Sequence, residues 1–194
     1  MYHSFPVVAS CDFAEGSATE TPWRKTPEYQ GGFLLDGGVH FIAGIRYMLG
    51  EEAAIVRASA YTSQLQKHLP PVDTVHATLK CKTGVSGIID ISFGTTATGG
   101  EWVVSCENGS VHVDKGKVTT TKPDGAEPEV KEFEDRNGVK EEVQAWAEGI
   151  VAGKQHQRQI PEEALKDLDV VSLAFYVVDY IHANLYFLAR GHAS

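Results

Sequence analysis

Three short turn sequences, each set between stretches of alternating polar and apolar residues, constrain this chain most strongly. The turns are Thr83-Gly84, Asn108-Gly109 and Lys115-Gly116. Side chains alternate between the two faces of a β-strand, and Asn-Gly is the strongest short hairpin signal because both residues accept positive φ. We therefore predict three antiparallel hairpins between residues 75 and 121.

Further alternating segments extend this sheet to six to eight strands. The predicted strands are Phe5–Phe13, Ile55–Thr62, Val75–Lys82, Ser86–Phe93, Glu101–Cys106, Ser110–Asp114, Lys117–Thr121 and Glu129–Phe133. Residues 14–30 are predicted to form a polar loop, in which Trp23 and Tyr29 pack against the body of the protein.

An almost wholly apolar segment, residues 31–50, interrupts the predicted strands. It carries Asp36 and His40, whose four-residue spacing places both on one face of a helix that ends near Gly50. Four glycines at its start allow another backbone or a ligand to come close. A carboxylate beside an imidazole fixes its tautomer, so His40 can serve as general acid or base near pH 7. The alternative is a helix N-cap Asp and a histidine whose hydrogen bonds a neighbour satisfies.

The last third of the chain is predicted to be helical. Residues 139–152 place Trp146 and Ile150 on an apolar stripe, and Pro161 opens a longer helix towards Leu188. We expect Trp146 to be part of the core together with the aromatic residues of the last helix, and the alternative for the apolar stretch Val170–Leu188 is an interface. Together the segments predict one α+β domain over residues 1–194, with a large, predominantly antiparallel open sheet and helices on one face.

Composition excludes several classes of function. The formal net charge of −9 argues against nucleic-acid binding, and no apolar run approaches the roughly 20 residues that span a membrane. The N-terminus does not resemble a signal peptide, and the three cysteines are isolated, so we expect a cytoplasmic protein with reduced thiols. The histidines lack ligand-type spacing, and we predict no metal site.

Several motifs resemble the glucose–fructose oxidoreductase, inositol dehydrogenase and rhizopine-catabolism (Gfo/Idh/MocA) family, and its fungal-type members most closely. The similar residues are Pro22-Trp23-Arg24, Pro27–His40, Arg46–Gly50, Leu69–Thr74, Gly84–Gly87, Ser92-Phe93-Gly94, Glu141–Gly153 and Ile160–Leu168. The resemblance covers nearly the whole chain, but only the C-terminal half of such proteins.

This resemblance implies a dihydrodipicolinate-reductase-like substrate domain, which in the family follows a dinucleotide-binding domain and often pairs with another subunit. It implies that His40 handles the proton of a substrate hydroxyl group, with Asp36 beside it. Candidate substrate-binding residues are Trp23, Arg24, Tyr29 and Tyr47. Arg24 can hold an anionic group, and the alternative is a solvated loop charge.

Two departures from the family pattern limit what the resemblance implies. The sequence contains neither a Gly-x-Gly-x-x-Gly motif after a strand nor a Glu-Lys-Pro motif, so we predict no cofactor site in this chain. NAD(P) would act only if a separate Rossmann domain supplied it. Ala43 replaces a further acid that the family often has three residues after the histidine.

Three hypotheses follow for the function. The first, which we favour from the sequence, is a cofactor-independent enzyme in which Asp36 and His40 isomerise, dehydrate or cyclise a small oxygenated metabolite. The second is the C-terminal part of an NAD(P)-dependent oxidoreductase whose Rossmann domain lies elsewhere. The third is a non-catalytic dimerisation or binding module. Under all three we expect a homodimer through the open face of the sheet.

Overall fold

An eight-stranded sheet in the order β2-β3-β4-β1-β5-β6-β7-β8 forms the body of the molecule. The computed structural model describes residues 7–10, 22–26, 32–51, 54–96, 99–134 and 138–174. The strands are β1 (Val7–Ser10), β2 (Ile55–Ser63), β3 (Thr74–Cys81), β4 (Ser86–Ser92), β5 (Gly99–Cys106), β6 (Gly109–Asp114), β7 (Lys117–Thr121) and β8 (Glu129–Glu132). Strand β1 is parallel to β4, and the other neighbouring strands are antiparallel.

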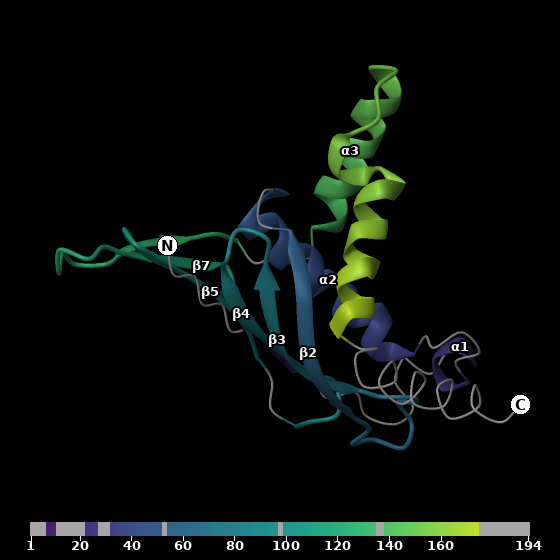
Figure 1. Ribbon diagram of the computed structural model, residues 1–194. Coiled ribbons are helices and arrows are strands. Elements are labelled where there is room, and N and C mark those ends of the chain that lie inside the picture. Colours follow the sequence, from purple (N-terminus) through teal and green to yellow (C-terminus); the bar gives the residue numbers. More distant parts are fainter. Residues whose placement is uncertain are drawn as a thin grey trace, which may run out of the picture.

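The helices are α1 (Pro22–Lys25), α2 (Phe33–Leu49), α3 (Val139–Val151) and a helix over residues 161–174, which the 3₁₀ turn Gln157–Gln159 precedes. Helix α2 and the helix over residues 161–174 cover one face of the sheet (Figure 1). The predicted α+β class, with a mainly antiparallel sheet, is confirmed. The prediction of an unbroken loop over residues 14–30 is wrong, because residues 22–25 form the short helix α1.

The alternation that predicted the strands also explains which face of the sheet is covered. On β3 the side chains of Val75, Ala77 and Leu79 are buried, whereas His76 and Thr78 between them are exposed. A strand with this pattern has one face against a hydrophobic core and the other in water. The hairpin at Lys115-Gly116 has positive φ at both residues, 43° and 79°, as a tight type I′ turn requires.

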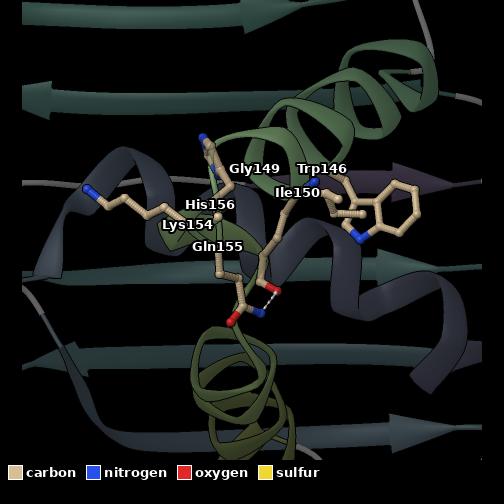
Figure 2. Close-up of a pocket in the computed structure, with 8 residues that line it drawn as sticks. Trp146, Gly149, Ile150, Lys154, Gln155 and His156 are labelled. Atoms are coloured by element: carbon tan, nitrogen blue, oxygen red, sulfur yellow. Dashed lines mark hydrogen bonds between the residues drawn. The ribbon is translucent and has the colours of Figure 1, made fainter.

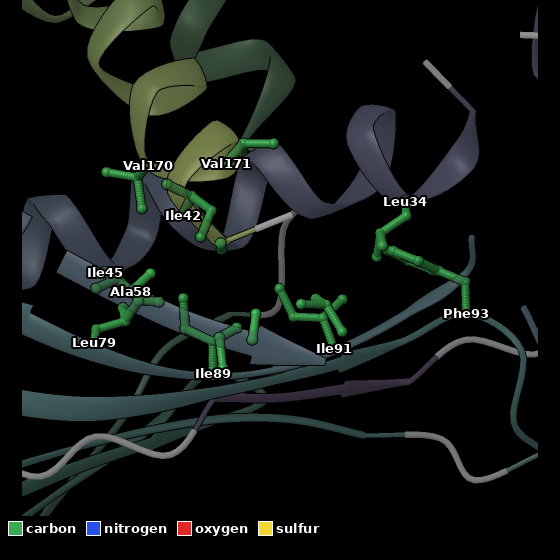
Figure 3. Packing of buried hydrophobic residues seen from close by; sticks show 14 of the residues in the cluster. Leu34, Ile42, Ile45, Ala58, Leu79, Ile89, Ile91, Phe93, Val170 and Val171 are labelled. Atoms are coloured by element: carbon green, nitrogen blue, oxygen red, sulfur yellow. The ribbon is translucent and has the colours of Figure 1, made fainter. Parts of the chain in front are cut away.

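Helix α2 covers the apolar face of β2–β4. Its residues Leu34, Ile42 and Ile45 are almost completely buried and recur at helical spacing, so they form one stripe. Val170 and Val171 of helix 161–174 complete this core, which Figure 3 shows between the helices and the sheet. Burying each such side chain contributes about 1.5–3 kcal/mol.

Two glycines explain how α2 comes so close to its neighbours. Gly32 has a φ of 86°, and a Cβ atom there would overlap the carbonyl oxygen of Pro70. A Cβ on Gly37 would lie 2.6 Å from the ring of Phe93. The sequence predicted that these glycines would let another backbone or a ligand come close. In the structure, the backbone of Pro70 lies close to Gly32, and the ring of Phe93 lies close to Gly37.

Asp73 is fully buried at the end of the loop before β3. Its carboxylate accepts hydrogen bonds from the backbone N–H groups of Leu65 and Gln66 and from the hydroxyl of Thr74, at 2.7–3.0 Å. These donors stabilise the buried charge in place of a basic side chain, and they fix the loop that faces Gly32.

Helix α3 stands away from the sheet (Figure 1) and buries none of its residues. The prediction that Trp146 belongs to the core is therefore wrong. The helical spacing correctly predicted an apolar stripe, but spacing alone does not say whether the chain itself covers the stripe.

Candidate functional site

The predicted pair lies on the side of α2 that faces away from the core. Asp36, His40, Ala43 and Tyr47 follow one another at spacings of four, three and four residues, so they form one outward stripe. His40 and Tyr47 are exposed, and Asp36 is half-buried. The structure thus brings three of the predicted site residues onto one face of one helix.

Arg24 from α1 holds the carboxylate of Asp36. Arg24 Nη2 donates to Asp36 Oδ2 at 2.6 Å, and the guanidinium lies over the rings of Trp23 and Phe33, at 4.7 and 5.3 Å from their centroids. Arginine stacks on aromatic rings and binds carboxylates in this way. The anionic group that Arg24 binds in this structure is Asp36 itself.

The ion pair with Arg24 separates Asp36 from His40. Within the described part of the chain, Asp36 and His40 share no hydrogen bond, because the carboxylate is turned towards Arg24. Trp23 is half exposed, which differs from its expected packing against the body. Tyr29 lies outside the described residues. The catalytic and substrate-binding assignments stay predictions.

A cluster of aromatic side chains supports the helix underneath this stripe. Phe41 stacks on Trp102 with ring centroids 5.9 Å apart, and Phe93 contacts Phe33 edge-to-face at 4.8 Å. Sequence reasoning did not single out these contacts. Gly37 and Gly44, seven residues apart and therefore on one face, were the available signal: a Cβ on Gly44 would lie 3.5 Å from Trp102.

The C-terminal half of α2 is joined to helix 161–174 by ionic bonds. Arg46 pairs with Glu163, at 2.8 Å, and with Asp167. Burial works against the charge on Arg46, but hydrogen bonds to Asp167 and Glu163 raise its pKa above the ordinary value. Next to it, the guanidinium of Arg158 lies 4.3 Å from the ring centroid of Tyr47, so the candidate Tyr47 contacts a protein side chain.

Acid is expected to weaken the ion pair between Glu163 and Arg46. The hydrogen bond from Lys166, followed by that from Arg46, lowers the pKa of Glu163 below its ordinary value of 4.5. A carboxyl group with a lowered folded-state pKa stabilises the fold above its unfolded pKa and loses that contribution as the pH falls through the folded value. We therefore expect urea unfolding to become easier below about pH 4.5, and Glu163→Gln to remove part of this dependence. An identical pH profile in the variant would contradict this role.

Two histidine–carboxylate pairs lie on the opposite, open face of the sheet. His76 Nδ1 is 2.9 Å from Asp90, and His112 Nε2 is 2.8 Å from Glu101. The side chains of His76, His112 and Asp90 are each about half exposed, so they are surface groups. Among the described residues no cluster of three or more His, Cys, Asp or Glu side chains has the geometry of a metal site.

A hollow of the described surface lies elsewhere, beside α3. It is about 320 Å³ in volume, and Trp146 and Ile150 line it together with residues of the following turn (Figure 2). None of the predicted site residues lines it. No helix in the described ranges is long and apolar enough to cross a membrane.

Comparison with known proteins identifies the family. The profile of the GFO/IDH/MocA C-terminal domain matches residues 6–112, more than half of the chain. The chain therefore belongs to the GFO/IDH/MocA family, and the resemblance read from the motifs is confirmed.

The relatives are dehydrogenases and oxidoreductases where their names give an activity. Dehydrogenase FPY6 of Fusarium mangiferae is 41% identical over 161 residues, which are 79% of this chain and 46% of that protein. An uncharacterized protein of Saccharomyces cerevisiae is 38% identical over 97 residues, 48% of this chain and 27% of that protein. The chain spans about half or less of the length of these relatives.

Solved structures share the fold. An oxidoreductase from Thermotoga maritima superposes with a TM-score of 0.76 at 25% identity, over 88% of this chain and 50% of that one. Aldose-aldose oxidoreductase from Caulobacter crescentus, complexed with glycerol, gives 0.72 at 19% identity, over 91% and 53%. An Agrobacterium radiobacter oxidoreductase in complex with NAD+, L-tartaric acid and magnesium gives 0.67 at 18% identity, over 90% and 53%.

Proposed function

We propose that this chain is the substrate-side domain of an NAD(P)-dependent oxidoreductase, and that a separate Rossmann domain holds the dinucleotide. The observation that carries the proposal is the family match together with length: the matched 161 residues of this chain correspond to 46% of a protein named as a dehydrogenase. This is the second of the three hypotheses from the sequence. The comparisons lend no support to the cofactor-independent reaction that we favoured there.

Among the described residues, the glycines at the start of α2 do not fit a dinucleotide. A phosphate cradle needs glycines that leave backbone N–H groups free at the start of a helix. Here Gly32 packs against Pro70 and Gly37 against Phe93, so the glycines of α2 serve packing within the domain. In this proposal the chain binds the substrate, and the other domain binds the dinucleotide.

In this proposal His40 takes or returns the proton of a substrate hydroxyl group. Its exposed position on the outward stripe of α2 leaves the imidazole accessible to a substrate. Asp36 and Arg24 act as an ion pair that fixes the start of the stripe. Tyr47 lies on the same stripe, and Trp23 lies against Arg24; in this proposal both contact the substrate, and Tyr29 is a further candidate.

A chimaera tests the proposal. The chain replaces the matched 161 residues of the Fusarium dehydrogenase, so that the remainder of that protein supplies the other domain. We expect the chimaera to oxidise NADPH or NADH with small carbonyl compounds, and the chain alone to bind neither dinucleotide by calorimetry. Conversion of a substrate by the chain alone, without dinucleotide, would instead support isomerisation, dehydration or cyclisation through His40.

We also propose a homodimer through the open sheet face. Tyr61, His76 and Asp90 lie side by side on β2, β3 and β4, and Ile88 is exposed on the same face. We expect a dimer by sedimentation at micromolar concentration, and Ile88→Glu to shift it towards monomer because a carboxylate would be placed in the contact. A monomeric wild-type chain would contradict the dimer.

A further inference from the structure

The guanidinium group of Arg24 lies against two aromatic rings beside the start of α2. Its central carbon is 4.7 Å from the ring centroid of Trp23 and 5.3 Å from that of Phe33. The ring of Phe33 is itself fixed, because it is buried and contacts Phe93 edge-to-face at 4.8 Å. Contacts of this kind hold the plane of an arginine side chain in one orientation.

Hydrogen bonds use only part of this arginine. A guanidinium group has five N–H donors, and Nη2 of Arg24 gives one of them to Asp36 Oδ2. Within the described part of the chain, no second side chain accepts a hydrogen bond from Arg24, and its Nε is buried without a partner. Buried polar groups are normally hydrogen-bonded, so this arginine has donors to offer to a further acceptor.

Arg24 lies close to the place of the proposed proton transfer. Its partner Asp36 precedes His40 by four residues of α2, which is about one turn, or about 6 Å along the helix axis. Side chains of a helix point back towards its N-terminus, which brings the imidazole of His40 towards the end of α2 where Arg24 lies. One small molecule can therefore contact both the imidazole and the guanidinium group.

The outward stripe carries more positive than negative charge. Asp36 is its one carboxylate, and Arg24 neutralises it. At the other end of the stripe the guanidinium of Arg158 lies over Tyr47, 4.3 Å from the ring centroid. The chain as a whole has a formal charge of −9, so an anion is attracted to this side of α2 in preference to the rest of the protein. Among anions, a carboxylate matches the planar fork of an arginine with its two oxygen atoms.

We propose that Arg24 binds a carboxylate group of the substrate, and that the substrate is a small hydroxy acid or the corresponding oxo acid. This inference rests on the proposed function and names its substrate class. In the oxidation, the hydroxyl proton passes to His40 and the hydride from the same carbon passes to NAD(P)+ on the other domain, so the carboxylate itself is unchanged. Asp36 is a positioning residue, because its contact fixes the guanidinium group of Arg24.

Two probes that differ in a single group test the substrate class. Glycerate and glycerol share a three-carbon skeleton with hydroxyl groups, and only glycerate carries a carboxylate. Each is titrated into the complete 194-residue chain at pH 7.5 and constant ionic strength, and tryptophan fluorescence reports binding because Trp23 lies against Arg24. We expect glycerate to bind at least tenfold more tightly than glycerol. Arg24→Gln should remove this preference and leave the binding of glycerol unchanged.

Arg158→Gln is the matched control. It removes another arginine that lies over an aromatic ring of the stripe, but at the Tyr47 end, about 16 Å along α2 from Asp36. We expect glycerate binding to change by less than threefold in this variant. An equal loss in Arg158→Gln and Arg24→Gln would mean that the positive charge attracts anions without a specific contact, and it would overturn the inference.

The remaining outcomes also decide the inference. A wild-type chain that does not prefer glycerate overturns it, and so does a folded Arg24→Gln variant that keeps the preference. Circular dichroism checks the fold. If Arg24→Gln does not fold, Arg24→Lys takes its place: it keeps the charge but lacks the fork, so we expect at least threefold weaker glycerate binding, and unchanged binding overturns the inference.

This experiment is independent of the test of the proposed function. The binding assay needs neither a dinucleotide nor turnover, so the chain can prefer glycerate even if the chimaera is inactive. Conversely, the chimaera can reduce neutral carbonyl compounds even if Arg24 binds no carboxylate of a substrate. The two failures are therefore distinguishable.

Discussion

Replacing His40 with alanine in the chimaera is expected to lower kcat/KM by about 10²–10⁴-fold, the usual contribution of a positioned general acid or base. The fold should survive, because the His40 side chain is exposed on the outward stripe of α2 and no described residue hydrogen-bonds to it. Steady-state kinetics and thermal unfolding of the same preparation separate the two effects.

His112→Ala is the matched control for this experiment. His112 is also a partly exposed histidine with a carboxylate nearby, but it lies on β6, away from α2 and from the residues of the proposed dimer contact. We expect His112→Ala to retain nearly full kcat/KM. Equal losses in the two variants, or full activity in His40→Ala, would contradict a role of His40 in the reaction.

The ion pair with Arg24 changes what is expected of Asp36. If Asp36 oriented the imidazole, Asp36→Asn would match the loss in His40→Ala. Because Arg24 holds the carboxylate instead, we expect a smaller loss, accompanied by lower stability from the uncompensated guanidinium charge. A loss as large as that of His40→Ala would show that Asp36 turns to His40 during the reaction.

Gly32→Ala is expected to lower the free energy of unfolding by about 3 kcal/mol or more. With φ at 86° and ψ at 178°, residue 32 occupies a region that is essentially restricted to glycine. In addition, the new methyl group would overlap the Pro70 carbonyl, which the loop fixed by Asp73 holds in place. Denaturant unfolding at equilibrium measures the loss.

Gly50→Ala separates the two causes. Gly50 has nearly the same conformation, with φ at 76° and ψ at 166°, but a Cβ there would meet nothing within 4 Å. We expect Gly50→Ala to cost about 1–3 kcal/mol from backbone strain alone. Equal costs at the two positions would mean that Pro70 moves aside, and α2 would then not depend on close contact with that loop.

The sequence predicted the parts of the fold that local patterns determine. The turn at Lys115-Gly116, the end of α2 at Gly50 and the alternation along β3 are each encoded within a few residues. The contact between Arg24 and Asp36 is different, since two separate helices must pack before the charges meet. The spacing within α2 therefore could not predict that the Asp36 carboxylate binds Arg24 and not His40.

The exposed stripe of α3 shows another limit of sequence reasoning. The positions of Val143, Trp146 and Ile150 predict an amphipathic helix whether its partner is the sheet, a second chain or another domain. Only the position of α3 away from the sheet shows that the described part of the chain does not bury the stripe. Residues 175–194 lie outside the described part of the chain, so the prediction that the last helix reaches Leu188 remains open.

The placement of β1 has a consequence for how the sheet assembles. Strands β2–β4 and β5–β8 are two antiparallel sets that pair between neighbours in sequence, whereas β1 lies between them and pairs residue 8 with residues 90 and 101. Contacts between residues distant in sequence form slowly, because the chain entropy of closing the loop is lost before the contacts form. The two sets are therefore expected to form first, and the four residues of β1 to join them into one sheet in the late, rate-limiting step of folding.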